Sequence, residues 1–545
     1  MSHLNWKTLI GLVRVTAAAF ASLLAVPAQA AVPGITGPTF TLRAGPAYIS
    51  QPDGTSVYSW GYGCNGAPAG YAPTAISGSC GTMQMPGPTL IATEGDTVIV
   101  NLTNTLPAAA GNTSILFPGF NVCPGTLSGG VCTPGGGVQG LLTREATPGG
   151  TVTYSFNTTG KAGTRAYYSG TQGDLQIEMG LYGAIIILPK TADIPSNCVG
   201  TQNDSARAND FGNGLEADFR LRKAAYNHAQ ACYDREYLFQ FSEMDPKIHR
   251  AAEGIATCAA GPGITCPPNM NTVETEPYHP AYYMINGRSM PDDMDPNYAV
   301  QYPHQPYNGN PHMHPGELTL LRIIGQGRWQ HPFHEHGNHV RVLARDGNLL
   351  LARDPTNPAL PDPQQRLAGP LLFTTTTTPG QAMDGIFVWT GKGLNWDVFG
   401  HTDDPLKPTA AGTCTPDANG YYTSNPAAPN YYEWCQDHNK ALESKPFGLV
   451  GSGGPVTLPD ANIVANGAWY AGSPYLGPDA NVRAVGSTPI PPSGTVANSP
   501  TDEAGFAFMW HSHNEREITT NNIFPGGMLM MMLVDPRFFV IDESK

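Results

Sequence analysis

Two copies of a strand–turn–strand pattern constrain the fold of this chain most strongly. In the first copy, the apolar run from Pro86 to Ala92 is followed by Gly95-Asp96 and then by a second run that ends at Leu102. Glycine and aspartate are typical of tight reversals, so we interpret this segment as two strands joined by a turn. A similar pattern returns from Pro315 to Ile324. The sequence therefore predicts two related β-sandwich units.

The composition supports an all-β chain that is rich in turns. Of the 545 residues, 63 are glycine and 51 are proline, and they are spread between apolar runs with strand character. This spacing is typical of an ordered β-protein and not of a disordered chain. Helix signals are scarce. The best of them is the stretch from Ala206 to Ala231, where a short helix could form between the two units.

The first 30 residues have the pattern of a secretory signal. Lys7 and Arg14 precede an apolar run, and Ala28-Gln29-Ala30 fits a small-residue cleavage site. Removal of this segment takes away two positive charges and changes the formal net charge from −14 to −16, which argues against nucleic acid or an anionic membrane as a partner. No later run is long enough for a membrane helix. We expect a periplasmic or secreted protein with no membrane span and no nucleic-acid partner.

The strand pattern divides the chain behind the signal into two domains. We expect a first domain over residues 31–190, a linker over 191–233, and a second domain over 234–545. The second domain contains two long insertions rich in proline, glycine and asparagine, Thr402 to Ser444 and Ile463 to Ser499. Long segments of this composition are surface loops by default.

Cysteine usage agrees with export. The ten cysteines all follow the signal segment, which suits an oxidising compartment; they are Cys64, Cys80, Cys123, Cys132, Cys198, Cys232, Cys258, Cys266, Cys414 and Cys435. Pairing of sequence neighbours in five disulfides is the simplest hypothesis, although the sequence does not fix the connectivity. None of the cysteines is beside a histidine pair, so we interpret all of them as structural.

Two His-x-His pairs, each in a segment with strand character, are the strongest chemical signal. His334 and His336 form the first pair, and His511 and His513 form the second. Alternate residues of a strand share one face, so each pair presents two imidazoles together. Four imidazoles suit copper, zinc, nickel or iron. The alternative is a set of hydrogen-bonded histidines in a polar core that holds no metal.

Three other segments have a functional and a structural interpretation. His312-Met313-His314 lies between two prolines, and an exposed loop is favoured over a secondary copper contact. Met528 and Met530-Met531-Met532 can supply soft ligands for copper(I), but a buried strand with methionine as core filler is favoured. For Glu515-Arg516-Glu517, a solvated loop or a supporting role near the second histidine pair is favoured over catalysis.

Several motifs resemble those of multicopper oxidases. The run His331-Pro332-Phe333-His334-Glu335-His336-Gly337 is similar to the His-Pro-x-His-x-His-Gly motif of that family. Pro86 to Leu90 and Gly180 to Ala184 resemble parts of the family's first cupredoxin domain, and segments of the second unit resemble bacterial members: Ile285 to Arg288, Trp389 to Gly393, and Pro525 to Met528. The resemblance implies two cupredoxin-like Greek-key β-sandwich domains, with long loop insertions in the second.

The resemblance also implies copper chemistry, but the first unit departs from the family pattern. Family members use eight histidines to hold a three-copper cluster that reduces O2. No histidine occurs between His3 and His228. Other residues stand at the corresponding positions of the first unit: Leu116, Pro118, Tyr168 and Gly170. The first unit therefore offers none of its cluster ligands.

A second departure affects the type 1 copper, through which family members take up electrons one at a time. Ser512 stands where the family has the cysteine thiolate, and Glu517 stands where it has the second type 1 histidine. A serine hydroxyl cannot supply the soft sulfur bond of a blue-copper site. His331 remains as the third member of the set. We therefore expect no type 1 centre.

These observations predict an exported protein that binds copper through His334, His336, His511 and His513. If it is an enzyme, the resemblance implies a copper-dependent oxidoreductase that does not reduce O2 by four electrons on its own. The alternatives are a non-catalytic copper-binding or scaffold protein, and one subunit of a larger oxidase assembly. In the last case a homo-oligomer or a partner subunit would supply the missing ligands, as in two-domain members of the family.

Overall fold

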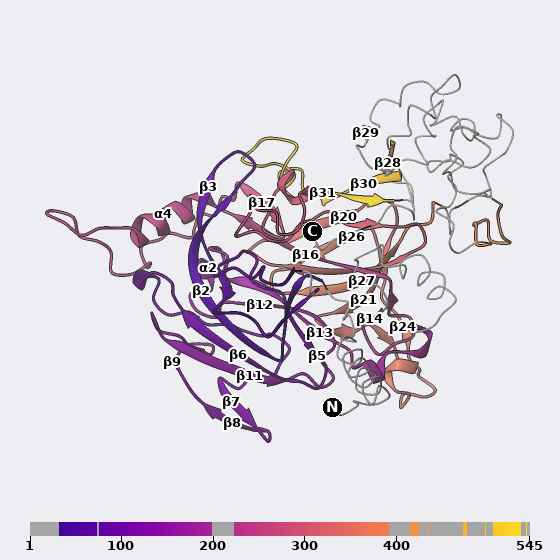
Figure 1. Cartoon of the computed structure of the whole chain (residues 1–545), viewed down its shortest axis with the longest axis horizontal. Coiled ribbons are helices and arrows are strands. Elements are labelled where there is room, and N and C mark those ends of the chain that lie inside the picture. Colours follow the sequence, from indigo (N-terminus) through magenta and orange to yellow (C-terminus); the bar gives the residue numbers. More distant parts are fainter. Residues whose placement is uncertain are drawn as a thin grey trace, which may run out of the picture.

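The computed structural model describes residues 32–73, 76–198, 223–391, 415–424, 434, 472–476, 496–497, 505–535 and 541. The expected signal segment and most of the two expected insertions lie outside these residues. Two β-sandwiches lie side by side in the described part (Figure 1). None of its helices is long and apolar enough to cross a membrane.

Two sheets form the first sandwich. The four-stranded sheet has the order β11 (Thr151–Asn157), β6 (Thr97–Asn104), β2 (Thr39–Ser50) and β3 (Ser56–Cys64). The five-stranded sheet has the order β12 (Gly163–Tyr168), β13 (Tyr182–Leu188), β5 (Leu90–Thr93), β1 (Gly34–Thr36) and β4 (Gly70–Ala72). The turn predicted at Gly95-Asp96 joins β5 to β6, and Gly95 has φ of +93°, which favours glycine.

Alternating burial along β6 explains how the two sheets of the first sandwich pack together. Val98, Val100 and Leu102 are buried, whereas the residues between them are partly exposed. This period of two is that of a strand with one face toward the core. The buried side chains belong to a cluster that also contains Trp60 and Tyr154.

Two larger sheets form the second sandwich. One has the order β17 (Tyr282–Ile285), β16 (Arg235–Met244), β19 (Leu318–Gly325), β27 (Ala382–Val388), β21 (Val340–Arg345) and β22 (Asn348–Leu349), with β25 (Leu371–Leu372) also on β21. The other has the order β18 (His312–Met313), β31 (Leu529–Val534), β30 (Gly505–Ser512), β20 (His331–Glu335) and β26 (Thr374–Thr377), with β28 (Gly472–Leu476) on β30 and β29 (Val496–Ala497) on β28. The prediction of an all-β fold with two β-sandwich units is confirmed.

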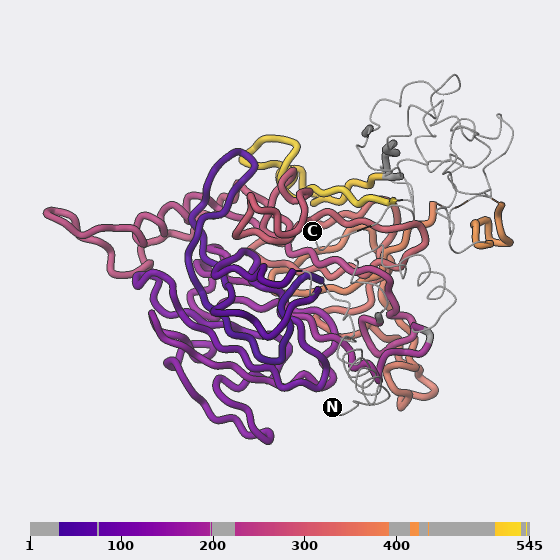
Figure 2. The backbone as a smooth tube through the Cα atoms, viewed as in Figure 1, coloured from indigo at the N-terminus to yellow at the C-terminus, as the bar shows by residue number. Residues whose placement is uncertain are grey.

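The two sandwiches share buried contacts. Ile186 of the first belongs to the same apolar cluster as Leu238 and Ala382 of the second, and the hydroxyl of Tyr182 donates to Ser242 Oγ over 2.7 Å. In Figure 2 the indigo and magenta tube of the first sandwich runs along the orange and yellow tube of the second. The strands of the two sandwiches fall on either side of the expected linker, while the domain boundaries stay a prediction.

Shorter elements connect the sheets. The strands are β7 (Gly125–Ser128), β8 (Val131–Pro134), β9 (Val138–Gln139), β10 (Arg144–Glu145), β14 (Lys223–Ala224), β15 (Cys232–Tyr233), β23 (Leu351–Ala352) and β24 (Arg366–Leu367). The helices are η2 (Ala108–Ala110), α2 (Gly173–Gln176), η3 (Thr191–Asp193), η4 (Ser196–Cys198), α4 (Pro246–Ala256), η5 (Asp292–Met294) and η6 (Asp362–Gln364).

The longest helix among the described residues, α4, was not expected from the sequence. Asp245 caps it by accepting a hydrogen bond from the Lys247 backbone N–H over 2.8 Å, and Pro246 is favourable in the first turn. Ile248 and Ala252 pack into the core of the first sandwich. Within the stretch 206–231, where the sequence suggested a short helix, residues 223–231 form β14, a bend and a turn. The rest of the stretch lies outside the described residues, so the expected short helix stays a prediction.

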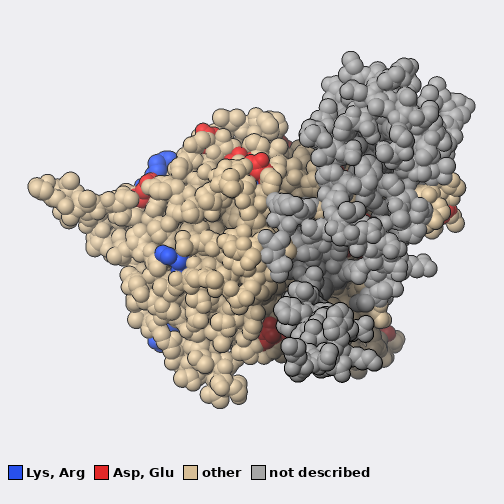
Figure 3. Space-filling model, in the orientation of Figure 1, with Lys and Arg blue, Asp and Glu red and all other residues tan. Residues whose placement is uncertain are grey.

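Four of the five expected disulfides join sequence neighbours, as predicted: Cys64–Cys80, Cys123–Cys132, Cys198–Cys232 and Cys258–Cys266. The fifth pair, Cys414 and Cys435, lies outside the described residues. On the face drawn in Figure 3, charged side chains are scattered among uncharged ones. That distribution agrees with a charged fraction of only 13%.

Substitution of a methionine in β31 tests how much this strand contributes to the core of the second sandwich. Met530 is fully buried beside Phe333 and Trp510, so Met530→Ala should lower the free energy of unfolding by about 2–5 kcal/mol through cavity formation. Met530→Leu preserves volume and should cost less than about 1.5 kcal/mol. Urea denaturation of the metal-free protein measures both. Loss of copper from a stable Met530→Leu variant would contradict a purely structural role.

Candidate metal centre

The two histidine pairs lie on neighbouring strands of one sheet. β20 and β30 are antiparallel, and their register places His334 directly opposite His511. His336 and His513 follow immediately after the two strands, and the His513 N–H donates to the carbonyl of Pro332 over 2.8 Å. The sequence predicted two strands that each present a pair. The structure shows that these strands are hydrogen-bonded to each other.

The four imidazole rings form one cluster. The ring centroids of His334 lie 4.7, 5.6 and 4.8 Å from those of His336, His511 and His513. His511 is 5.1 Å from His336 and 5.5 Å from His513. His334, His336 and His511 are buried, and His513 is exposed. The cluster therefore has a buried side and a side open to solvent.

One pair of ring nitrogens has a spacing that suits a shared metal. His511 Nδ1 lies 2.7 Å from the carbonyl oxygen of Ser512, which only accepts, so Nδ1 carries the hydrogen when the ring is neutral. Its Nε2 then has the lone pair, and it lies 3.2 Å from His336 Nε2. Two nitrogens bound tetrahedrally at about 2.0 Å from one metal are about 3.3 Å apart.

Side chains of the neighbouring strand orient the cluster. His334 Nδ1 lies 2.7 Å from Thr374 Oγ1, at the start of β26. A partner of this kind fixes the rotation of a metal-binding imidazole. The ring of Phe373 packs edge-on against His334 at 5.6 Å and is 52% exposed. Sequence reasoning missed Thr374 and Phe373 because they lie about 40 residues from the histidine motif.

The electrostatic environment favours neutral rings. Burial, together with the neighbouring rings of His511 and His513, lowers the pKa of His334 to about 4. Burial also lowers the pKa of His511, where His513 acts in the same direction. Neutral imidazole is the form that binds metals. Both residues are therefore in a binding-competent protonation state at neutral pH.

The cluster is not a preformed coordination shell. Within the described residues, no group of three or more histidine, cysteine, aspartate or glutamate side chains is arranged so that it could hold a metal ion as it stands. The donor chemistry and the 3.2 Å spacing between His336 and His511 fit a metal, and rotation of the other two rings would be needed to complete the set.

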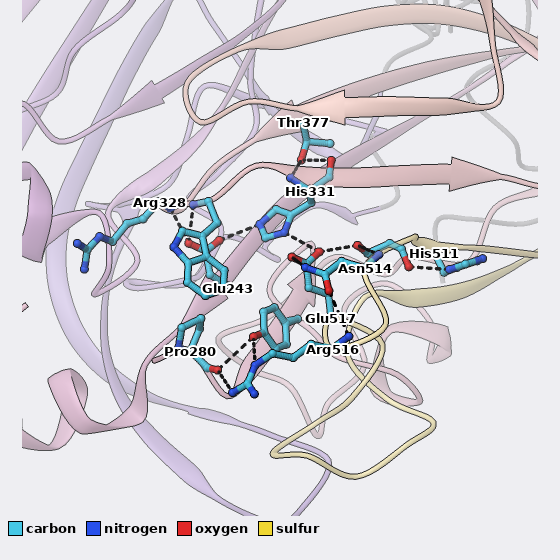
Figure 4. Close-up of polar contacts among 12 residues, drawn as sticks. Glu243, Pro280, Arg328, His331, Thr377, His511, Asn514, Arg516 and Glu517 are labelled. Atoms are coloured by element: carbon cyan, nitrogen blue, oxygen red, sulfur yellow. Dashed lines mark hydrogen bonds and ion pairs between the residues drawn. The ribbon is translucent and has the colours of Figure 1, made fainter. Parts of the chain in front are cut away.

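A second polar cluster surrounds His331, at the opposite end of β20 from His336 (Figure 4). His331 Nε2 lies 2.9 Å from Glu243 Oε2, and His331 Nδ1 lies 2.9 Å from Glu517 Oε2. Ser512 Oγ donates to the same Glu517 oxygen over 2.5 Å. All four side chains are buried. His331, Ser512 and Glu517, the residues that the resemblance places at type 1 ligand positions, are thus joined to one another.

This cluster stabilises a charged histidine. Burial alone would lower the pKa of His331, but its contacts with Glu243 and Glu517 outweigh burial and raise the pKa to about 9. The ring is therefore an imidazolium at neutral pH and bridges two carboxylates. An unpaired buried charge would be costly, and this arrangement pairs it on both sides.

The positions that lack histidines in the first sandwich also lie together. The Leu116 N–H donates to the carbonyl of Tyr168 over 2.8 Å, and the Tyr168 N–H donates back over 3.3 Å. A Cβ atom added to Gly170 would lie 2.7 Å from Leu116 Cγ, so these residues are in contact. An apolar and aromatic surface therefore stands at the positions where the resemblance would place imidazoles.

The other candidate segments have mixed outcomes. The loop interpretation of His312-Met313-His314 is wrong: His312 and Met313 form β18, His314 is fully buried, and His312 Nδ1 lies 2.6 Å from Asp535 Oδ2. The buried-strand interpretation of the methionines is confirmed. In the segment 515–517, residues 515 and 516 are exposed as expected, but Glu517 is buried.

Glu335, between the two histidines of the first pair, is a buried acid that the sequence reasoning did not single out. It is 1% exposed, and Thr375 Oγ1 donates to its Oε1 over 3.1 Å. Burial raises its pKa to about 8, so it is protonated at neutral pH. Strand alternation provides the signal that could have found it, because the residue between two histidines of one face must point to the other face.

Comparisons with known proteins point to one family. A family model described as multicopper oxidase matches residues 77–192. Laccase-24 of Oryza sativa subsp. japonica is 36% identical over 118 residues, which are 22% of this chain and 17% of that protein. Multicopper oxidase MCE of Talaromyces pinophilus is 35% identical over 127 residues, which are 23% of this chain and 19% of that protein. These matches span less than a fifth of each relative.

Two solved structures of copper oxidases align with most of this chain at low sequence identity. The multicopper oxidase mgLAC aligns over 92% of this chain and 87% of its own chain, with a TM-score of 0.42 and 15% identity. The blue copper oxidase from Nitrosomonas europaea aligns over 91% of this chain and 85% of its own, with the same TM-score and identity.

The charge on His331 makes stability depend on pH. Its folded pKa of about 9 lies above the ordinary value of 6.5, so it contributes stability that is complete below pH 6.5 and is lost as pH rises through about 9. The full contribution is on the order of 3 kcal/mol. Glu517→Gln should therefore lower the free energy of unfolding at pH 6.

The difference between wild type and Glu517→Gln should shrink toward pH 10, where His331 of the wild type has lost its charge. Urea denaturation of the metal-free proteins across pH 6 to 10 measures it. The exposed neighbour Glu515 supplies the matched control, Glu515→Gln, which should follow the wild type. A Glu517→Gln difference that stays constant with pH would contradict the charged state of His331.

Proposed function

We propose that this chain, a member of the multicopper oxidase family by the match of residues 77–192, is an exported protein that binds copper through His334, His336, His511 and His513. The observation that carries this proposal is the clustering of the four imidazoles, with the Nε2 atoms of His336 and His511 3.2 Å apart. The lowered pKa values of His334 and His511 support it, because metal binding then displaces few protons.

The chain's own groups would hold and orient the metal. His336 and His511 have the spacing of two ligands of one ion, and Thr374 sets the rotation of His334. Copper, when bound, would supply one-electron redox chemistry. The exposed ring of His513 leaves one side of the cluster accessible to water or a small molecule. The substrate class is an oxidisable or reducible small molecule that reaches this side.

Ser512 and Glu517 argue that the protein does not oxidise substrates in the manner of a complete laccase. A serine and a glutamate offer no thiolate through which electrons could enter. Their side chains are hydrogen-bonded to each other, and Glu517 is ion-paired with His331. A copper-dependent oxidoreductase without independent reduction of O2 is the proposed activity. A copper-binding or scaffold protein without catalysis is the alternative that the same observation supports.

Assembly with another subunit is a further candidate that one observation favours. Phe373 is 52% exposed although it packs on His334, so an aromatic side chain at the edge of the histidine cluster faces solvent. A second chain that covered this edge could add ligands. For export, the four disulfides support an oxidising compartment, either the periplasm or the extracellular space.

The copper content of the purified protein tests the site. We expect about one copper per chain and at most two, because only four clustered imidazoles are present. His334→Ala combined with His511→Ala should abolish binding, since each strand loses one ligand. Elemental analysis after dialysis measures this, with His339→Ala as a control, because His339 also contacts Phe373 but is outside the four-imidazole cluster. Full copper content in the double variant would mean that copper binds elsewhere in the protein, and His312 and His314 would be tested next.

Spectroscopy and activity measurements test whether the protein lacks a type 1 copper, the site at which electrons would enter. The copper-loaded protein should lack an intense blue absorption band, because that band requires a copper–thiolate bond that Ser512 cannot make. Oxidation of phenols coupled to O2 consumption should be absent or trivial. An intense blue colour or robust phenol oxidation by the pure chain would refute this part of the proposal.

A further inference from the structure

The cluster around His331 connects three segments of the chain. In multicopper oxidases, the type 1 copper would connect the corresponding segments. His331 begins β20, Ser512 ends β30, and Glu517 follows β30 after a short turn. Family members join these three positions through the type 1 copper. Here they are joined by the ion pair of 2.9 Å between His331 and Glu517 and by the hydrogen bond of 2.5 Å between Ser512 and Glu517. The donor set of serine, glutamate and an already paired histidine does not fit a type 1 copper.

We propose that the side chains of His331, Glu517 and Ser512 form a metal-free replacement for the type 1 centre, in which a shared proton network holds β20 and β30 in place. Glu243 completes the replacement from the opposite sheet of the sandwich. The role assigned to these residues is positioning: they fix the ends of the two strands that carry the histidine pairs. The inference needs no copper at His334 or its neighbours.

Hydrogen bonds hold the carboxylate of Glu243 in one position. Its Oε1 accepts the backbone N–H groups of Arg328 and Trp329 over 2.7 and 2.9 Å, and its Oε2 faces His331. The Tyr278 hydroxyl also lies 3.3 Å from Oε1. A Cβ atom added to Gly327 would lie 2.5 Å from Glu243 Oε2, and Gly327 has φ of +66°, so the backbone approaches this carboxylate too closely for a side chain.

The other end of the network is equally constrained. Glu517 Oε1 accepts from Asn514 Nδ2 over 2.9 Å, and the Met528 N–H donates to the carbonyl of Glu517 over 2.8 Å. The backbone N–H of His331 donates to Thr377 Oγ1 over 3.3 Å, and that hydroxyl donates back to the His331 carbonyl over 3.2 Å. Backbone and side chain of His331 are thus both held, as Figure 4 shows.

The balance of charges explains how a protonated His331 can take the place of a metal ion in this cluster. His331 carries one positive charge between two carboxylates, and the remaining negative charge is spread over the N–H and O–H donors of the surrounding residues. Burying such a set is tolerable only when every partner is present, and removing one partner leaves an uncompensated buried charge. The network is therefore cooperative, and its loss should loosen both strand ends at once.

The first test uses metal-free protein and does not depend on copper. In 15N-histidine NMR spectra at pH 7, His331 should have both ring nitrogens protonated. Glu517→Gln should lower the pH at which His331 titrates, and Glu515→Gln should leave it unchanged. Finding a neutral His331 in the wild type would overturn the proposal. The variant His334→Ala/His511→Ala should keep the imidazolium signal, which separates this test from the copper proposal.

The second test measures positioning directly by hydrogen exchange. In metal-free Glu517→Gln, the backbone amides at the ends of β20 and β30 should exchange at least about tenfold faster than in the wild type, because a buried charge loses its partner. Amides of the first sandwich, such as those of β6, should be unaffected. Unchanged exchange at both strand ends would show that the network does not position them.

The third test replaces the proton network by a metal. Ser512→Cys combined with Glu517→His supplies a thiolate and an imidazole beside His331, and Co²⁺ should bind there with a thiolate-to-cobalt absorption band. Cobalt should then restore amide protection at β20 and β30 in this double variant and should change neither property in the wild type. A wild-type protein that binds Co²⁺ at His331, with loss of its imidazolium signal, would overturn the proposal.

Discussion

The pairing of β20 with β30 is the constraint on which the candidate site depends. Their register sets His334 opposite His511 and Phe333 opposite Ser512. Side chains alternate between the faces of a sheet, so this single register sends both histidine pairs to one face and Phe333, Glu335 and Trp510 toward the other. A slip of one residue would exchange the two sets. Burial of the aromatic rings in the core therefore also determines where the imidazoles lie.

Two histidines of β20 have pKa values that are shifted in opposite directions. Within the four-imidazole cluster, burial keeps His334 neutral, with a pKa of about 4. Three residues earlier, His331 is equally buried but has carboxylates on both sides, and its pKa is about 9. Two histidines of one strand thus differ in charge at neutral pH because their partners differ. The neutral one can bind a metal, and the charged one cannot while it holds both protons.

The fold was predictable where its signals are local. The turn at Gly95-Asp96, the paired neighbouring cysteines and the buried methionines of β31 follow from short patterns in the sequence. His334 and His336 could be placed on one face for the same reason. The loop expected at 312–314 failed because its flanking prolines suggested a turn, whereas parallel pairing with β31, some 220 residues later, makes His312 and Met313 a strand.

The parts of the site that could not be predicted come from long-range contacts. Glu243 lies 88 residues before His331 and is one of ten consecutive buried residues of β16, so no local pattern marks it as a partner. Glu517 looked like part of a charged, solvated segment because Glu515 and Arg516 precede it. Glu243 reaches His331 from the opposite sheet of the sandwich, and the pairing of β20 with β30 brings the segment of Glu517 to the same imidazole.

The losses in the two sandwiches have different physical consequences. In the first, Leu116 and Tyr168 stand at two of the positions where the resemblance places imidazoles, and backbone hydrogen bonds join them to each other. In the second, a histidine remains, and a buried histidine needs partners. Glu517 and Glu243 supply them with charge. Restoring the family pattern would therefore require new ligands at Leu116, Pro118, Tyr168 and Gly170 in the first sandwich. At His331 it would also require removal of an ion pair that contributes to stability.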